Sequence, residues 1–363
     1  MIAHKIKLEN FRNYEKLDLD FGENINIIYG DNAQGKTNIL EAVHMFSVGK
    51  SNRTYKDGEL IMHGKPSAKA AIEFSAQERE QSACIEMFKS KRKIISVNDI
   101  PIKKNSELVG RFNVVYFGPE FLGLVKDGPK KRRRNIDVLI SQLRPNYFSA
   151  IVSLRKIVES KNALLKMLQP NETLLEIMNE KLANVSTEII RYRCTYIEKI
   201  EKIATEIQSE ISGGTETLSI KYLSCVGDVS GMNDEEICTK IKEKITASQK
   251  REREYHECII GPHREDIEFD INGKDAKVFG SQGQQKTIVL VEKLAEVTLI
   301  HEEIGEYPVL LLDDIMSELD KKRQGFILRR IPNIQILITC TEKDGFETLN
   351  NSRYIHVVDG RVV

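Results

Sequence analysis

Gly30-Asp31-Asn32-Ala33-Gln34-Gly35-Lys36-Thr37 is a complete Gly-x-x-x-x-Gly-Lys-Thr phosphate-binding loop. Its glycines let consecutive backbone N–H groups turn toward one anion, and the helix expected after it adds the positive end of its dipole. Apolar residues at 25–29 predict a strand before the loop, and those at 39–46 predict a helix after it. We therefore predict an ATP site over the whole of residues 30–37, in which Lys36 reaches the β- and γ-phosphates and Thr37 ligates Mg²⁺.

A second motif, Pro308-Val309-Leu310-Leu311-Leu312-Asp313-Asp314, reads as a buried strand that ends in two carboxylates. Such a pair would be weak evidence alone, but a phosphate-binding loop precedes it. Asp313 is predicted to hold Mg²⁺. Asp314 stands where ATPases of the ABC class usually place a glutamate that activates the attacking water. Its shorter side chain predicts either a slow ATPase or a base that acts at longer range.

A third motif separates this chain from other proteins with a phosphate-binding loop. Ser281-Gln282-Gly283-Gln284 resembles the ABC signature Leu-Ser-Gly-Gly-Gln, with Ser281, Gly283 and Gln284 retained, although Gly280 and Gln282 depart from it. In ABC and SMC proteins this signature begins a helix and contacts the γ-phosphate held by the other subunit, as anions bind at helix starts. Ser317-Glu318-Leu319-Asp320 matches the D-loop of the same class, with Ser317 and Asp320 at the dimer interface.

The order of the elements predicts an α/β fold with an insertion. Strands alternate with helices from residue 261 onward, which indicates a parallel sheet covered on both faces, while residues 68–118 read as further β structure. Helical periodicity from 146 to 211, broken at Pro170-Asn171, predicts an antiparallel helical hairpin. We expect an ABC/SMC-like P-loop ATPase head, with a parallel core sheet and an antiparallel β part, made of residues 1–118 and 260–363. A mostly helical arm, residues 119–259, is inserted between these halves.

Composition limits the compartment in which the protein is expected to work and the kinds of site it can contain. The chain has 363 residues, formal net charge zero and 40% hydrophobic residues. It contains no apolar run long enough to cross a membrane and no secretion signal, so we expect a cytoplasmic protein. Its six cysteines include no Cys-x-x-Cys pair, which argues against a zinc site or a disulfide framework.

Charge is unevenly distributed along the chain. Residues 89–134 hold thirteen Lys and Arg against four Asp and Glu, an excess that indicates a nucleic-acid-binding face. The candidates for contact with DNA phosphates are Lys130, Lys131, Arg132, Arg133 and Arg134. Runs of charge are more often solvated faces, so both interpretations stay open.

Four segments carry a resemblance to the RecF family that extends along the whole chain. Residues 119–137 resemble the RecF signature, with departures at Phe121, Asp127 and Asn135. Similar likenesses are found at 8–14, 261–266 and 313–320.

The resemblance implies a bacterial recombination mediator that dimerises on ATP, binds DNA at gaps or junctions without sequence preference, and promotes RecA loading in repair, replication restart and the SOS response. It also implies a weak, DNA-stimulated ATPase with RecR and RecO as partners. In SMC-like heads an arginine matching Arg12 approaches the nucleotide. The resemblance assigns no role to His263 or Arg264.

Three other functions deserve comparison. An ABC transporter ATPase subunit would carry a switch histidine near 338–341, where none is present, and a signature much closer to the phosphate-binding loop. An SMC-type chromosome organiser would need far longer heptad repeats than this chain contains. A DNA clamp that needs ATP binding, with hydrolysis incidental, would share every motif described above.

Overall fold

The computed structural model describes residues 1–54, 56–330, 333–342 and 352–363, and these residues form two compact units. The first unit combines Met1–Gly123 with Val289–Val363, and the second is Leu124–Ile288. The boundary between them falls inside one helix, α7 (Gln282–Ile304). No helix among the described residues is long and apolar enough to cross a membrane.

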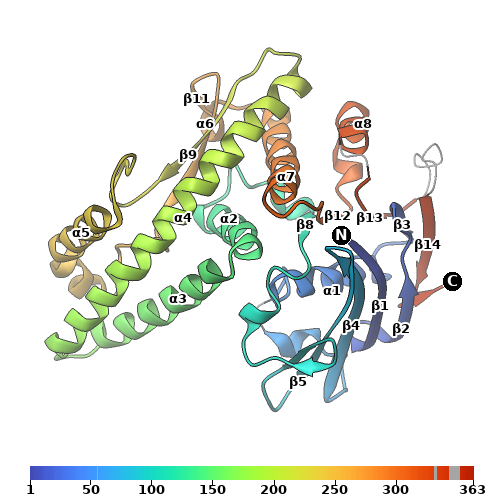
Figure 1. Cartoon of the computed structure of the whole chain (residues 1–363), viewed down its shortest axis with the longest axis horizontal. Helices are drawn as coiled ribbons and strands as arrows, with labels where there is room; N and C mark the ends of the chain where they lie inside the picture. Colours follow the sequence, from blue (N-terminus) through green and yellow to red (C-terminus); the bar gives the residue numbers. More distant parts are fainter. Residues whose placement is uncertain (55, 331–332, 343–351) are drawn as a thin grey trace. The chain divides into compact units, whose positions relative to one another are not determined.

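The first unit contains two sheets with helix α1 (Lys36–Val48) packed against strands of both (Figure 1). One sheet is antiparallel in the order β2-β1-β4-β5-β6-β7. Its strands are β1 (Ile2–Phe11), β2 (Tyr14–Asp20), β4 (Ser67–Ala76), β5 (Arg79–Phe88), β6 (Ile94–Val97) and β7 (Ile100–Pro101). Alternate residues of β1 and β4 point into a core shared with α1, which is why these strands alternate between apolar and polar residues.

The other sheet has the order β15-β14-β3-β13-β12-β8, and all its pairs except β14 with β15 are parallel. Its strands are β3 (Ile25–Tyr29), β8 (Val114–Phe117), β12 (Val309–Asp313), β13 (Ile336–Cys340), β14 (Ser352–Val358) and β15 (Arg361–Val362). All five residues of β12 are buried, as expected for a central strand of a parallel sheet. The carboxyl ends of β3 and β12 therefore lie at one edge of the sheet, with β13 between them.

The second unit is built around a long helical hairpin (Figure 1). Helix α3 (Pro145–Leu165) packs against α4 (Glu172–Ser212), which the side chain of Asn171 caps at its start and Gly213 ends in the left-handed conformation. The break predicted at Pro170-Asn171 is the turn between them. The remaining helices are α2 (Pro129–Leu143), α5 (Asp234–Tyr255) and α6 (Ala276–Phe279).

The second unit also contains a three-stranded sheet that the sequence analysis placed elsewhere. Strand β10 (Asp266–Ile271) pairs with β9 (Leu218–Leu223) and with β11 (Lys274–Asp275). Residues 260–288 therefore belong with the arm, not with the head as the expected boundary at 259 had it. The reason is the long-range pairing of β10 with β9, a strand that was not predicted although Leu218, Ile220 and Tyr222 alternate with Ser219 and Lys221.

Candidate nucleotide-binding site

The loop at residues 30–37 joins β3 to α1 and depends on its glycines. Gly30 has φ 148° and Gly35 has φ 116°, in the region that side chains rarely adopt. A Cβ on Gly30 would lie 2.3 Å from the carbonyl oxygen of Val357, and one on Gly35 would lie 2.6 Å from the amide nitrogen of Asn13. The backbone therefore approaches its neighbours too closely for any side chain at either position.

Lys36 is buried, and its ammonium group stays inside the loop. Its Nζ donates to the carbonyl oxygens of Gly30 at 2.7 Å and Asp31 at 2.8 Å. Asp31, Asn32 and Ala33 are exposed at the rim, and Gln34 is half-buried. A pocket of about 290 Å³ opens beside the loop, where the rings of Tyr29 and His356 stack 4.7 Å apart. The loop thus presents a cation and a helix N-terminus to one point, as phosphate binding requires.

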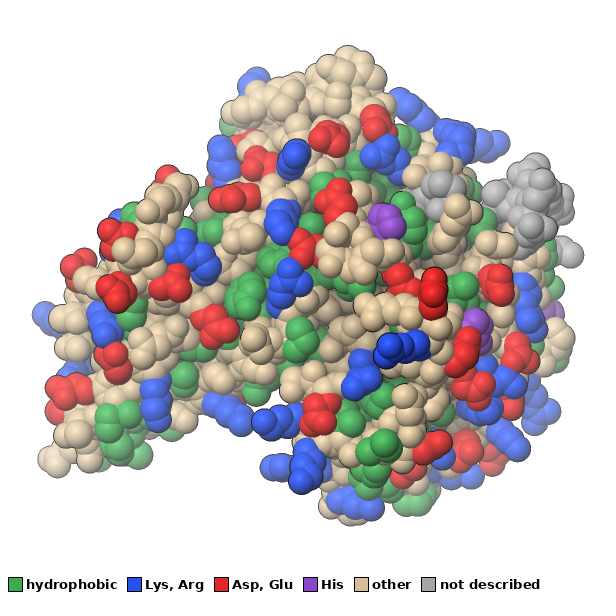
Figure 2. Space-filling view, in the orientation of Figure 1, with side chains coloured by type: hydrophobic (Ala, Val, Ile, Leu, Met, Phe, Trp, Pro, Cys, Tyr) green, Lys and Arg blue, Asp and Glu red, His purple; other side chains and the backbone are tan. Residues whose placement is uncertain are grey.

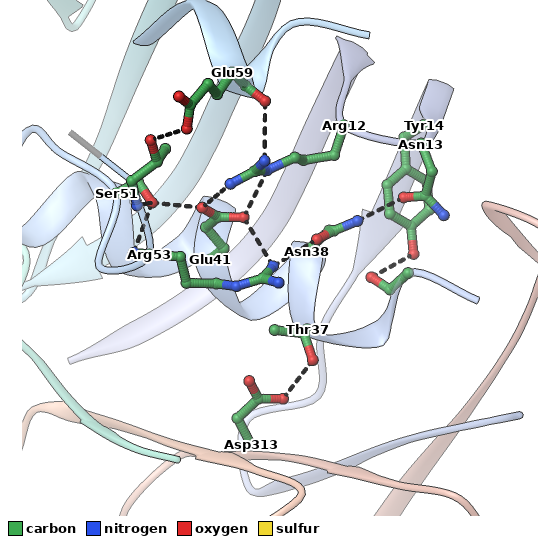
Figure 3. Close-up of polar contacts among 12 residues, drawn as sticks. Arg12, Asn13, Tyr14, Thr37, Asn38, Glu41, Ser51, Arg53, Glu59 and Asp313 are labelled. Atoms are coloured by element: carbon green, nitrogen blue, oxygen red, sulfur yellow. Dashed lines mark hydrogen bonds and ion pairs between the residues drawn. The ribbon is translucent and has the colours of Figure 1, made fainter. Parts of the chain in front are cut away.

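Thr37 and Asp313 meet across the sheet edge, although they are far apart in sequence. The Thr37 hydroxyl donates to Oδ1 of Asp313 at 2.9 Å (Figure 3). The hydroxyl of Thr339 donates to the same oxygen at 2.7 Å, and that of Tyr116 donates to Oδ2 at 2.8 Å. The described residues contain no cluster of three or more His, Cys, Asp or Glu that could hold a metal. One hydroxyl and one carboxylate suit Mg²⁺, which usually keeps few protein ligands beside water and substrate phosphates.

Asp314 follows Asp313 at the end of β12 with an unusual backbone. Its φ is 49°, which costs a non-glycine residue conformational energy and often marks functional sites. Its N–H donates to the Thr339 hydroxyl at 2.8 Å. Burial raises the pKa of Asp314, the nearby Lys36 ammonium opposes that rise, and Asp313 adds to it. The turn therefore holds a carboxylate with weakened acidity beside the phosphate-binding loop.

Arg12 lies in the turn between β1 and β2 and is held by a fully buried carboxylate. Its Nε and one terminal nitrogen donate to the two oxygens of Glu41, at 3.0 and 2.8 Å, and the other terminal nitrogen donates to the Glu59 carbonyl (Figure 3). Glu41 also accepts from Ser51 at 2.5 Å and Arg53 at 3.3 Å. This network lies on α1 one turn beyond Thr37. The structure thus shows a positioning carboxylate for Arg12, while the contact of Arg12 with nucleotide stays a prediction.

A chain of amides connects this network to the loop. Arg53 donates to Oδ1 of Asn38, Asn38 donates to Asn13, and Asn13 donates to the carbonyl oxygen of Gln34 at 2.9 Å. The second strand of that turn adds the Tyr14 hydroxyl, which donates to the carbonyl oxygen of Gly35. The β1–β2 turn therefore buttresses the back of the phosphate-binding loop.

The signature residues begin α7 in the second unit. The Ser281 hydroxyl accepts from the N–H of Gln284 at 3.2 Å, and the Gln284 side chain accepts from the N–H of Ser281 at 2.8 Å. This is a reciprocal capping box. Ser281 and Gly283 are exposed, while Gln284 also donates to Glu216. The motif therefore has a structural role in starting the helix, besides any role toward nucleotide.

The D-loop is tightly turned. Ser317 donates to the carbonyl oxygen of Asp314 at 2.8 Å, inside a short 3-10 helix (Met316–Glu318). Asp320 accepts from the N–H of Arg323 at 2.9 Å, and this bond is the main cause that lowers the pKa of Asp320. The turn that carries Asp314 thus continues directly into the D-loop and the next helix.

The basic run at 130–134 differs from its predicted role. Arg132 is buried, and its guanidinium pairs with Asp266 at 2.7 Å and donates to three carbonyl oxygens between Leu124 and Asp127. Arg133 is half-buried and donates to the carbonyl of Glu265, and Lys131 pairs with Asp127. Helix α2 therefore turns Arg132 inward, so of the five candidates for DNA contact this one is engaged within the unit. Lys130 and Lys131 are exposed, and Arg133 and Arg134 are half-exposed.

The residues at 261–266, which had no assigned role, organise the interior of the second unit. Glu265 accepts from Arg193, Tyr222, Ser224 and the N–H of Cys225. Burial lowers the pKa of His263, whose Nε2 lies 3.0 Å from the carbonyl oxygen of Cys258. This motif therefore ties β10 to α4 and β9.

Sequence reasoning missed four side chains of the first-unit site, namely Tyr116, Thr339, Glu41 and Arg53. Each belongs to an element that was predicted or to a loop, but nothing in the local pattern distinguishes it from an ordinary strand, helix or loop residue. Only the pairing of β8 and β13 with β12 brings Tyr116 and Thr339 onto Asp313.

Together the loop, the paired acids at the end of β12 and the parallel sheet define a P-loop ATPase head. The chain matches the family described as "RecF/RecN/SMC N terminal domain" over residues 2–362. It is 41% identical to the DNA replication and repair protein RecF of Clostridium perfringens strain 13, over all of this chain and 99% of that protein. The corresponding protein of Acetivibrio thermocellus is 40% identical, over 99% of each chain.

Solved structures agree with these sequence comparisons. A structure described as the recombination mediator protein RecF with ATP in the RecFOR pathway superposes with TM-score 0.92 at 38% identity, covering all of this chain and 97% of that one. An Smc head bound to the C-terminal winged-helix domain of ScpA shares only the fold, at TM-score 0.54 and 18% identity. The chain belongs to the RecF family.

Proposed function

We propose that this protein is an ATP-dependent recombination mediator that dimerises on ATP, binds DNA at gaps or junctions and promotes RecA loading in repair and replication restart. The observation that carries the proposal is the meeting of Lys36, Thr37, Asp313 and Asp314 at one sheet edge. The related solved structure with ATP supports the choice of nucleotide, and its pathway supports RecR and RecO as partners. Such a protein would work in the bacterial cytoplasm.

The residues at the nucleotide-binding site have distinct roles in this proposal. The N–H groups of residues 30–37 and the Lys36 ammonium bind the phosphates. Arg12, in the turn between β1 and β2, approaches the same phosphates. Thr37 and Asp313 are the residues that would hold Mg²⁺, which when bound neutralises charge on the β- and γ-phosphates. Asp314 accepts a proton from the attacking water. Its side chain, shorter than the glutamate usual at this position in ABC ATPases, suits a slow hydrolysis that DNA stimulates.

The site is completed by a second copy of the chain. Ser281, Gly283 and Gln284 of one protomer face the γ-phosphate held by the other, and Ser317 and Asp320 cross the interface. Because the nucleotide contacts both protomers, its binding shifts the equilibrium from monomer to dimer.

Sedimentation with and without ATP–Mg²⁺ tests this arrangement. Wild type should shift from monomer to dimer when nucleotide is added. The Ser281→Arg variant should bind nucleotide, measured by a fluorescent ATP analogue, and stay monomeric because a long side chain blocks the interface. Nucleotide-dependent dimerisation of that variant would refute the assignment of the signature.

A second candidate function is an ATP-gated DNA clamp whose hydrolysis is incidental. The short side chain of Asp314 favours it, because a carboxylate held farther from the attacking water than a glutamate would be gives slow turnover. Comparison of Lys36→Arg with Asp314→Asn separates the two functions. If both variants retain full repair activity without turnover, the clamp is correct. If the Asp314→Asn variant still binds DNA but has no repair activity, ATP hydrolysis is required for repair and the mediator function is correct.

A further inference from the structure

Helix α8 (Lys321–Arg330) is the most basic helix segment of the first unit. It carries Lys321, Lys322, Arg323, Arg329 and Arg330, and it contains no acidic residue. Lys and Arg side chains gather over α8 at the upper right of Figure 2. At 100° per residue the five basic positions fall within an arc of about 200°, slightly more than half of the helix, and Gln324 and Ile327 lie in the remaining arc.

The opposite half of α8 attaches the helix to the head. Ile327 is its one buried apolar residue, and Gln324 donates to the carbonyl oxygens of Met316 and Leu319, at 2.6 and 3.0 Å. Asp320 caps the first turn through the N–H of Arg323 and pairs with that residue's guanidinium. Helix α8 is therefore fastened to the D-loop, and through Ser317 to the turn that carries Asp314.

Two features of α8 oppose its own stability. Three basic residues occupy its first turn, where the helix dipole favours acidic ones. Gly325 stands in the middle of the helix, where alanine would be better. The space over Gly325 is used, because a Cβ there would lie 2.9 Å from a terminal nitrogen of Arg329. The glycine thus leaves room for the Arg329 guanidinium beside the helix.

These features make α8 a better candidate for contact with phosphates than the run at 130–134. In that run Arg132 is buried and paired, and Arg133 is half-buried against Glu265. On α8 the side chains of Lys321, Lys322 and Arg329 are exposed.

We infer that the basic half of α8 binds the phosphate backbone of DNA, and that its attachment to the D-loop passes this binding to Asp314. The inference rests on the proposed function, since it names the surface through which DNA would stimulate hydrolysis. Contacts of this kind are independent of base sequence, and each one steepens the decrease of log affinity with log salt by about 0.9.

The test is charge reversal at the first two positions, Lys321→Glu with Lys322→Glu. Acidic residues suit the start of a helix, so the variant should fold and bind nucleotide as wild type does, which thermal melting and a fluorescent ATP analogue check. The matched control is Lys16→Glu with Lys69→Glu, two exposed lysines on strands β2 and β4 of the same unit that lie outside residues 89–134.

Binding of a labelled gapped duplex is measured by fluorescence anisotropy between ~50 and ~200 mM salt. Two lost contacts should lower the salt slope by about 1.8, which corresponds to roughly 60-fold weaker binding at 0.1 M salt relative to a 1 M reference. Stimulation of ATP hydrolysis by DNA should fall with it, while hydrolysis without DNA stays unchanged.

Three outcomes would overturn the inference. They are wild-type DNA affinity in the α8 variant, an equal loss in the control pair, or full stimulation by DNA despite weakened binding. If wild type itself binds no DNA, it is the proposed function that fails, so the two failures are distinguishable.

Discussion

Thr339→Val is expected to damage both the stability and the catalytic turn of the head. The Thr339 hydroxyl is fully buried, donates to Oδ1 of Asp313 at 2.7 Å and accepts from the N–H of Asp314 at 2.8 Å. Valine keeps the branched shape and removes both bonds. The substitution therefore isolates the hydroxyl.

The expected loss of stability follows from the two groups that lose their hydrogen-bond partner, the Asp313 carboxylate and the Asp314 N–H. A hydrogen bond to a charged carboxylate contributes about 1.5–3 kcal/mol, and an unsatisfied buried N–H costs about 1–3 kcal/mol. Because these terms share one hydroxyl, we expect a combined loss of roughly 2–5 kcal/mol. In a domain of this size each kcal/mol lowers Tm by about 2–4 °C, so the expected fall is roughly 4–20 °C.

The assay is thermal unfolding together with steady-state ATP hydrolysis. The turnover number should fall because Asp314, held at φ 49°, loses the bond that fixes its backbone. KM should change less, since Lys36 and the phosphate-binding loop are untouched.

Thr341→Val is the control for this experiment. It makes the same change two residues further on, at an exposed position, and should alter stability by no more than about 0.5 kcal/mol. The reasoning is refuted if Thr339→Val has the same Tm as the control and keeps the wild-type turnover number, because the Thr339 hydroxyl then does not position Asp313 and Asp314.

Three further predictions concern charged side chains. Glu41→Gln should destabilise the first unit by about 3–5 kcal/mol in urea unfolding, because it leaves the guanidinium groups of Arg12 and Arg53 without their buried carboxylate; an unchanged midpoint would contradict the network. Asp314→Asn should melt higher than wild type at neutral pH, because burial raises the pKa of Asp314 above its ordinary value of 3.8 and the folded state resists the charge. The difference in Tm between Asp314→Asn and wild type should grow as pH rises from that ordinary value to the raised pKa of the folded state, stay constant above it, and vanish at lower pH. A difference in Tm that grows toward acid pH would contradict a raised pKa. Arg193→Leu should destabilise the second unit by about 3–5 kcal/mol, because it leaves the Asp137 and Glu265 carboxylates without the buried guanidinium that both of them pair with; limited proteolysis of that unit measures it, and wild-type resistance would count against the buried pair.

Much of the head could be predicted from short stretches of sequence. Eight consecutive residues specify the phosphate-binding loop, because its anion site is made by the local backbone and by one lysine beside it. The buried strand at 309–313 shows its environment in its own composition, and the acids follow it directly. The helical hairpin was also predictable, since the 3.6-residue period and the break at Pro170-Asn171 are local signals.

Other features were decided only by tertiary structure. Thr339 and Tyr116 join the site because β13 and β8 pair on either side of β12, and no local pattern records that register. Arg132 has the sequence of a solvated run, yet it lies on the inward face of α2 against Asp266, a residue more than a hundred positions away. Residues 260–288 belong with the arm because β10 pairs with β9. In each case the deciding free energy comes from contacts between segments distant in sequence, and such contacts exist only once the chain has folded.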